Sequence, residues 1–370
     1  MSIFLLIMGI LLFIGLVILH EFGHFVVARR NGVVVEEFGI GFPPRAWKHK
    51  TKKGFLLTLN WLPIGGFVRL KGENDADKRP GSLGAASLKS KTKIMLAGVA
   101  MNLLIAFGIL TVLGWLGMPQ IVDNQFSVRS DTKVIGKSVV IAHVESGSPA
   151  FKAGLKQQDK IISVAGVGVK NASQLPQLTK NLAGSKVSIV YERDNREFAK
   201  DVLLNSQNTV DAAKKHGESK GYLGVTPSEY ELTHSTWSAP VNAVGMIGQF
   251  TGLTLKGLGT SVAALFHGDT ARASEQVSGP VGVIFVLKDG SLLGYQFVLC
   301  IIALISLTLA IMNVLPIPAL DGGRLFVILL ARLFGKQLTE KMEERIVGAS
   351  FLFLMFLIGL VTIVDVRRFF

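Results

Sequence analysis

Three residues near the N-terminus have the types and spacing of a hydrolytic metal site. They are His20, Glu21 and His24, within the segment His20-Glu21-Phe22-Gly23-His24. Residues four apart on a helix lie on the same face, so both imidazoles can reach one metal ion. In the pattern H-E-x-x-H the histidines bind zinc and the glutamate is the general base. The segment therefore predicts a zinc site with Glu21 as its catalytic residue.

The pattern lies inside an apolar run from Ile3 to Ala28. Ionisable groups at membrane depth are costly and usually functional. The alternative is that these polar side chains satisfy one another within a helix bundle, and chance matches to H-E-x-x-H do occur in soluble proteins. The cost of three such residues in one span favours the metal site.

A third ligand is needed, because catalytic zinc has three protein ligands and one open position. Asp321 is the candidate, since it follows the apolar run Tyr295–Leu315 and the segment Pro316-Ile317-Pro318. Proline breaks or kinks a helix, and irregular backbone at membrane depth is tolerated where it is buried in protein or lines a cavity. For Asp321 alone, a turn or helix cap in Asp-Gly-Gly is an alternative.

Composition places the chain among integral membrane proteins. Of its 370 residues, 49% are hydrophobic and 18% are charged, and the mean hydropathy is +0.45. A membrane-spanning helix needs about 20 apolar residues. Four runs satisfy this requirement and predict a polytopic α-helical fold: Ile3–Ala28, Ile94–Met118, Tyr295–Leu315 and Ile346–Val364. The apolar but glycine-rich run Val241–Phe266 carries Lys256, which favours a helix on the membrane surface.

The placement of the basic residues that give the formal charge of +13 predicts the orientation in the membrane. Basic residues recur between Arg29 and Lys93, as in a cytoplasmic loop. The N-terminus and residues 119–294 are then expected outside and 322–345 inside, although Arg367 and Arg368 disagree mildly with an outside C-terminus. No nucleic-acid-binding motif accompanies the charge, so no nucleic-acid partner is expected. Cys300 is the only cysteine, which excludes an intrachain disulfide.

The rest of the chain divides by pattern. Residues 1–118 and 295–370 form the two parts of a membrane core, and 241–294 hold the surface helix and a Gly-Pro-Val-Gly segment. Residues 134–204 show short β-rich runs separated by glycine and polar turns. The polar segment 205–240 is expected to be a linker. These runs are Ser138–Val144, Lys160–Val164, Lys186–Tyr191 and Phe198–Leu203, and Phe55–Leu70 predicts two further short strands about Asn60–Pro63.

Taken together, the first-span motif, Leu320-Asp321-Gly322 and a PDZ-like segment between them resemble the site-2 protease family. This is a family of intramembrane zinc metalloproteases, and the order resembles its bacterial branch. The resemblance implies a Zn2+ ion held by His20, His24 and Asp321, with Glu21 as the catalytic base. It also implies that Asn313 contacts substrate or the oxyanion of the reaction, whereas the alternative is a polar group that stabilises the helix break.

Two further segments carry the resemblance. Pro63-Ile64-Gly65-Gly66-Phe67-Val68 is similar to a family segment, and the region Phe55–Leu70 that contains it resembles a cytoplasmic, membrane-associated β-hairpin that pairs with unwound substrate in the family. This implies that Gly65, Gly66 and Phe67 contact substrate. The alternative is a hairpin that only packs on the membrane domain. The segment Val144–Ala150, followed by Ala153-Gly154-Leu155 and Asp159–Ile162, is similar to part of a PDZ domain, which implies that residues 134–204 form such a domain and bind a peptide ligand. The chain has room for one such domain, whereas some members of the branch carry two.

The resemblance implies an intramembrane metalloendopeptidase in the bacterial cytoplasmic (inner) membrane. Its substrates would be single-span membrane proteins, such as anti-sigma factors or remnant signal peptides, usually after a first cut outside. The site would lie toward the cytoplasmic side and the PDZ-like domain outside. Two alternatives stay open: a membrane-anchored zinc protease that acts on soluble or misfolded proteins, and a non-catalytic PDZ scaffold.

Overall fold

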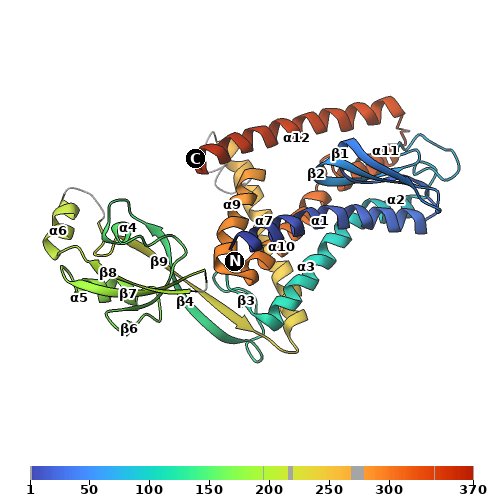
Figure 1. The fold of residues 1–370 in the computed structure, drawn as a ribbon. Helices are drawn as coiled ribbons and strands as arrows, with labels where there is room; N and C mark the ends of the chain where they lie inside the picture. The colour runs from blue at the N-terminus through green and yellow to red at the C-terminus, as the bar shows by residue number, and fades with distance from the viewer. Residues whose placement is uncertain (1, 195, 216–219, 268–278, 337, 370) are drawn as a thin grey trace. The chain divides into compact units, whose positions relative to one another are not determined.

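The computed structural model describes residues 2–194, 196–215, 220–267, 279–336 and 338–369 (Figure 1). The chain forms two compact units. One contains Thr111–Asn242 and Lys288–Phe297 together with the first five residues, and the other contains Leu6–Leu110, Ala243–Leu287 and Val298–Phe370.

Four described helices are long and apolar enough to cross a membrane, as the sequence predicts. They are α1 (Ser2–Arg30), α3 (Ala97–Leu116), α10 (Tyr295–Val314) and α12 (Glu340–Phe369). Leu16 of α1 and Ile302 of α10 pack with Leu287 of α9 (Pro280–Leu293) in one buried cluster. The membrane unit is therefore a helix bundle around an apolar core, which is the arrangement expected of a polytopic membrane protein.

The second predicted span begins later than Ile94, because two helices meet there. Helix α2 (Leu88–Met95) has Ser87 at its N-cap, whose side chain accepts a hydrogen bond from Ser90 N. It ends before Leu96, and α3 starts at Ala97. Carbonyl groups in the last turn of a helix lack intrahelical partners. The break at Leu96 thus makes the Ile94 carbonyl available to a side chain from another helix.

Helix α10 ends just before Pro316, as predicted, and α11 (Asp321–Leu333) begins a few residues later. Two glycines allow this abrupt restart. A β-carbon at Gly322 would lie 2.5 Å from Val314 O, and one at Gly323 would lie 1.9 Å from Ile317 O. Side chains at these positions would push α11 away from the end of α10. Asp321, the first residue of α11, is held in place by that close packing.

Helix α12 joins the membrane unit through polar contacts spread along its length. Ser350 Oγ accepts a hydrogen bond from Ala319 N at 3.2 Å. Near the other end of the helix, the buried Asp365 carboxylate accepts hydrogen bonds from Gly279 N and Gly282 N, both at 2.8 Å. The Gly-Pro-Val-Gly segment singled out in the sequence is therefore the start of α9, capped by Asp365.

Along the chain, α1 is followed by a small sheet made of β1 (Val35–Lys50) and β2 (Leu56–Leu70), and then by α2. Both strands bend at glycines with left-handed backbone, Gly41 (φ 77°) and Gly65 (φ 83°). The Glu37–Ile40 part of β1 therefore pairs both with Leu56–Leu59 and with Gly66–Arg69. The sequence predicts two short strands about Asn60–Pro63, but the structure has one continuous bent strand, in which Leu56–Leu59 and Gly66–Arg69 are separate pairing runs. They pair with β1 and not with each other, because the tight turn at 51–55 folds β2 back along β1.

A buried glutamate joins the runs of this sheet. The Glu37 side chain is 3% exposed, and its carboxylate accepts hydrogen bonds from Arg45 Nη2 at 3.0 Å and Thr58 Oγ1 at 2.8 Å. Arg69 Nη1 lies 3.3 Å from the other oxygen. A buried charge is tolerated when it is paired and hydrogen-bonded in this way. Glu37 is consequently the link that fixes the two bent strands on one another.

The other unit is built on a sheet with the order β3-β9-β4-β5-β7-β8, in which β6 pairs with β5. The predicted strands of residues 134–204 are confirmed, and the core between sheet and helices includes Ile141, Ile161, Leu175, Ile189 and Val202. The strands are β3 (Met118–Pro119), β4 (Lys133–Val144), β5 (Lys160–Val164), β6 (Val167–Gly168), β7 (Lys186–Arg193), β8 (Arg196–Leu203) and β9 (Val225–His234). The helices are α4 (Pro149–Lys152), α5 (Gln174–Asn181) and α6 (Gln207–Lys215).

The expectation of a linker over 205–240 is wrong for the described residues of that segment. Helix α6 lies there, and β9 pairs with β4 from Val225 opposite Val144 to His234 opposite Lys133. The pattern of β9 is polar because its side chains are half exposed or exposed. Its stability comes from a strand far away in the sequence, which local composition does not reveal. The β-rich unit therefore extends beyond residue 204.

The helix predicted over Val241–Phe266 is found as α7 (Ala239–Phe266), and its place on the membrane surface stays a prediction. Residues 268–278 of the predicted segment 241–294 lie outside the described part of the chain. Asp131 caps the start of α7. The Asp131 carboxylate accepts hydrogen bonds from Ser238 Oγ at 2.6 Å, Ser238 N at 3.1 Å and Thr236 N at 2.8 Å. Bonds from Ser238 and Thr236 to the charged form hold the pKa of Asp131 below its usual range.

We expect Glu37→Ala to loosen the β1–β2 sheet, because Arg45, Thr58 and Arg69 lose a shared acceptor. Hydrogen bonds to charged groups contribute about 1.5–3 kcal/mol. Local opening, measured as the rate of trypsin cleavage at the basic residues 45–53, should rise about tenfold or more. Glu36→Ala, at the neighbouring exposed position, is the control. Equal cleavage rates for both variants would contradict the assigned role of Glu37.

Acid should release the start of α7. Since the pKa of Asp131 is lower in the folded chain, its contribution is present above the unfolded pKa near 4 and is lost as pH falls through the folded value. Exchange protection of the Thr236 and Ser238 amides, corrected for intrinsic rates, should therefore decrease below about pH 4. In Asp131→Asn this acid-dependent decrease should disappear. Protection that stays constant with pH in the native protein would refute the cap.

Candidate metal centre

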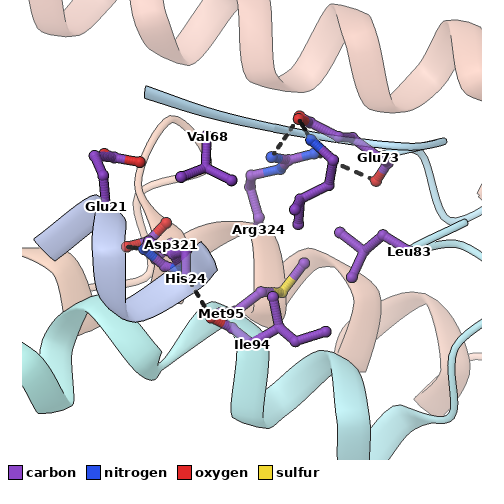
Figure 2. A pocket seen from close by; sticks show the side chains of 10 residues that line it. Glu21, His24, Val68, Glu73, Leu83, Ile94, Met95, Asp321 and Arg324 are labelled. Atoms are coloured by element: carbon purple, nitrogen blue, oxygen red, sulfur yellow. Dashed lines mark hydrogen bonds and ion pairs between the residues drawn. The ribbon is translucent and has the colours of Figure 1, made fainter. Parts of the chain in front are cut away.

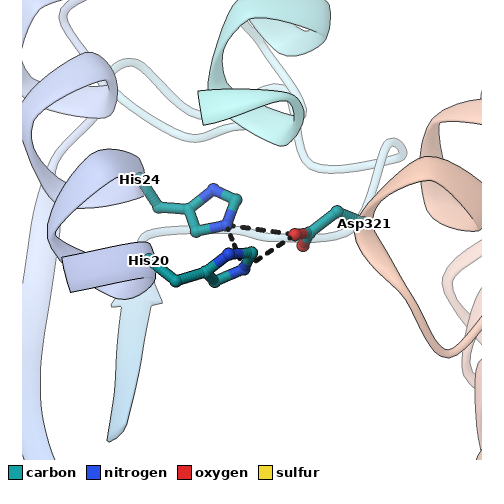
Figure 3. A group of neighbouring side chains, drawn as sticks. All are labelled: His20, His24 and Asp321. Carbon is teal, nitrogen blue, oxygen red and sulfur yellow. Dashed lines mark hydrogen bonds and ion pairs between the residues drawn. The ribbon is translucent and has the colours of Figure 1, made fainter. Parts of the chain in front are cut away.

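Helix α1 places His20 and His24 one turn apart with their rings in contact. The ring centroids are 5.0 Å apart at an interplanar angle of 71°, and the two Nε2 atoms are 3.3 Å apart. Both residues are buried, at 8% and 9% exposure. Figure 3 shows the two rings side by side on α1, both directed toward Asp321. The same-face arrangement expected from the spacing is therefore present.

The Asp321 carboxylate completes the group from a helix some 300 residues further along the chain. Its Oδ2 lies 3.1 Å from His20 Nε2 and 3.2 Å from His24 Nε2 (Figure 3). One ligand atom from each residue can be chosen so that all lie within 4.8 Å of one another, as in a group able to hold a metal ion. Two imidazole nitrogens and one carboxylate oxygen match the ligand types and number of a catalytic zinc site. The donor set fits zinc.

A backbone carbonyl orients His24. Its Nδ1 lies 2.7 Å from Ile94 O, the carbonyl at the end of α2. A carbonyl only accepts hydrogen bonds, so Nδ1 carries the hydrogen and the Nε2 lone pair faces the centre. Metal-bound histidines commonly donate their other ring N–H to such a carbonyl. The break between α2 and α3 thus contributes directly to the site.

Two glycines let α1 and α3 approach closely enough for the histidines to fit. A β-carbon at Gly98 would lie 2.5 Å from both His20 Nε2 and His24 Nε2, and one at Gly23 would lie 2.7 Å from Ala97 O. Neither glycine was singled out from the sequence. The available signal was the run of small residues Ala97-Gly98-Val99-Ala100, because small residues mark close helix contacts in membranes.

A cavity of about 90 Å3 lies beside the centre. Glu21, His24 and Asp321 form part of its wall, and Figure 2 shows Val68 of β2 next to Glu21 and Arg324 with Glu73 further along the cavity. A water molecule needs about 10–15 Å3 of such volume and a few polar partners, so several waters fit. The remaining lining residues are Leu70, Leu83, Ile94 and Met95. The site therefore has space for the water that a hydrolase consumes.

The sequence-predicted substrate residues are not all brought to the centre. A β-carbon at Gly66 would lie 3.6 Å from Glu21 Cγ, so the β2 backbone passes directly beside the predicted base. Gly65 forms the bend before it, and the Phe67 ring covers Gly39. Asn313 Nδ2 donates to Leu309 O at 3.0 Å within its own helix, and Asn313 does not line the cavity among the described residues.

Gly98→Ala should disable the centre while leaving α3 intact, because alanine is a better helix former than glycine but its methyl group would collide with both imidazoles. We expect zinc affinity to fall at least about tenfold by competition with a chelator. Gly108→Ala on the same helix, where nothing lies within 4 Å of the added carbon, is the matched control. Native affinity in Gly98→Ala would show that the rings do not need this space.

The chain is similar to known proteins over nearly its whole length. The model for peptidase family M50 matches residues 8–357. A candidate zinc metalloprotease of Clostridium acetobutylicum is 31% identical over 368 residues, covering 99% of this chain and 98% of the relative. The zinc metalloprotease RasP of Bacillus licheniformis is 26% identical over 443 residues, covering 98% of each protein.

The protein Eep of Enterococcus faecalis, named a probable protease, is 26% identical over 438 residues and is covered over 98% of its length. The alignments with RasP and Eep are longer than the 370 residues of this chain, so those relatives carry inserted segments. The family match nevertheless runs through the H-E-x-x-H segment, the β-rich unit and the helix break at Asp321. The chain therefore belongs to peptidase family M50, the site-2 proteases, and is a membrane-embedded zinc metalloprotease.

Proposed function

We propose that this protease cleaves single-span membrane proteins within or at the edge of the bilayer, with His20, His24 and Asp321 as zinc ligands and Glu21 as general base. One observation carries the proposal: two of the ligand side chains lie within the apolar helix α1, and the third stands at the helix break directly after the apolar α10. A substrate must reach that depth to be cut. A membrane-embedded substrate segment is already there.

Glu21 and the cavity beside it have separate roles in the proposed hydrolysis. When bound, zinc supplies a Lewis acid that activates water near neutral pH. Glu21 accepts the proton of the attacking water and delivers it to the departing amine. The cavity beside Glu21 admits the water, and the Arg324–Glu73 pair, with Nη1 and Oε2 3.4 Å apart, lies in its wall.

The small sheet supports a way to present the scissile bond. Peptide bonds in a helix are shielded, so the substrate must be held extended, and strand addition to a free sheet edge does this. The run Gly66–Arg69 pairs with β1 on one side, and among the described residues no other strand pairs with it. This edge begins beside Glu21. We therefore assign Gly65, Gly66 and Phe67 to the substrate-holding segment, with Gly66 closest to the catalytic glutamate.

The proposed setting follows from the charges and the β-rich unit. We place the chain in the bacterial cytoplasmic membrane with the basic loops and the zinc centre toward the cytoplasm, because basic residues concentrate between Arg29 and Lys93. The β-rich unit would then lie outside as a PDZ domain that binds an extended peptide. Suitable substrates are anti-sigma factors or remnant signal peptides that another protease has already trimmed.

A cleavage assay with a single-span reporter in detergent or liposomes tests the proposal. Glu21→Gln should reduce the cleavage rate by about 10²–10⁴-fold while zinc content stays at the native level, because the variant lacks the base but keeps the ligands. Glu36→Gln, which changes an exposed residue, is the control. Undiminished cleavage by Glu21→Gln would refute the mechanism. Cleavage of soluble casein but not of the reporter would show instead a membrane-anchored protease that acts on soluble proteins.

A further inference from the structure

Asn102 is a buried polar residue next to His20 that the proposed mechanism does not use. It lies on α3 one turn after Gly98, on the same face of the helix, and is 0% exposed. Its side-chain Nδ2 lies 3.1 Å from His20 Nδ1. Its backbone carbonyl accepts a hydrogen bond from Ser306 Oγ of α10 at 2.8 Å. Asn102 is thus held between α1 and α10, beside Nδ1 of His20.

The two histidines differ in the group that faces Nδ1, the ring nitrogen directed away from Asp321. His24 Nδ1 faces the Ile94 carbonyl, which requires a hydrogen on Nδ1 and leaves Nε2 free to bind a metal ion. For His20 Nε2 to act in the same way, its Nδ1 must also carry a hydrogen and needs an acceptor. An asparagine amide offers an acceptor or a donor at nearly the same position, depending on how it is turned.

A half turn of the Asn102 amide supplies the acceptor that His20 needs. Asn102 Oδ1, the only acceptor of the side-chain amide, is buried and has no hydrogen-bond partner among the described residues. A half turn of the amide brings Oδ1 to the position 3.1 Å from His20 Nδ1, where it accepts the Nδ1 hydrogen, and Nδ2 takes the former place of Oδ1. The turn exchanges two atoms of similar size, so it needs no movement of α3.

We propose that Asn102 is a positioning residue of the zinc centre: its amide oxygen accepts the Nδ1 hydrogen of His20 and so directs the Nε2 lone pair of that ring toward the metal ion. The inference rests on the proposed role of His20 as a ligand. Groups that orient a metal-bound histidine typically change metal affinity by 10–100-fold when they are removed. Asn102 would then do for His20 what the Ile94 carbonyl does for His24.

Substitutions at residue 102 separate this role from simple packing. Asn102→Leu removes the acceptor and keeps the volume, so the zinc dissociation constant, measured by chelator competition in detergent, should rise by about 10–100-fold. Asn102→Asp offers only acceptor oxygens at the same place and should stay within about threefold of native or bind more tightly. Thr111→Val, another buried polar site on α3, is the control and should not change zinc affinity.

Nitrogen-15 spectra of the histidine rings in the zinc-loaded protein give a readout that packing alone would not move. His20 should show its hydrogen on Nδ1 in the native protein and in Asn102→Asp. Three results would overturn the proposal: native zinc affinity in Asn102→Leu, equal weakening in the Leu and Asp variants, or a His20 hydrogen on Nε2. A native protein that binds zinc but cuts no single-span reporter would instead refute the proposed substrate class and leave the role of Asn102 standing.

Discussion

The close approach of α1 and α3 is the constraint on which the centre depends. Two imidazoles on α1 fit against the backbone of α3 because Gly98 has no side chain, and Gly23 on α1 allows the same approach in return. In a membrane, where helices gain little from the hydrophobic effect among themselves, such packing of small residues is a principal source of association. The same contact that joins two helices therefore creates the place for two ligands.

The rest of the centre follows from interruptions in helices. The break between α2 and α3 frees the Ile94 carbonyl for His24, and the break after α10 lets α11 begin with Asp321. Irregular backbone at membrane depth is stable only where it is buried or lines a cavity. Here both interruptions border the cavity beside Glu21. The two helix breaks thus lie where the site needs an orienting carbonyl, a carboxylate ligand and space for water.

Much of this arrangement could be predicted from the sequence, because the informative residues are rare in their surroundings. Histidine and glutamate in an apolar run indicate function by their cost, and Asp321 after two prolines indicates it together with the need for a third metal ligand. The strand runs of residues 138–203 follow from short β-rich stretches separated by glycine and polar turns. By contrast, β9 was missed because its pairing partner β4 is distant in the sequence, and Gly98 and Asn102 were missed because their importance arises only where two helices cross. The side-chain bond of Asn313 within its own helix likewise depends on a geometry that the sequence does not specify.

The central claim is that one zinc ion is held jointly by side chains of α1 and of the segment after α10. X-ray absorption at the zinc edge of the loaded protein tests this most directly. The account predicts two imidazole ligands and otherwise oxygen in the native zinc shell, with a single imidazole remaining in His24→Ala. A shell that contains sulfur, or one that is unchanged in His24→Ala, would contradict it.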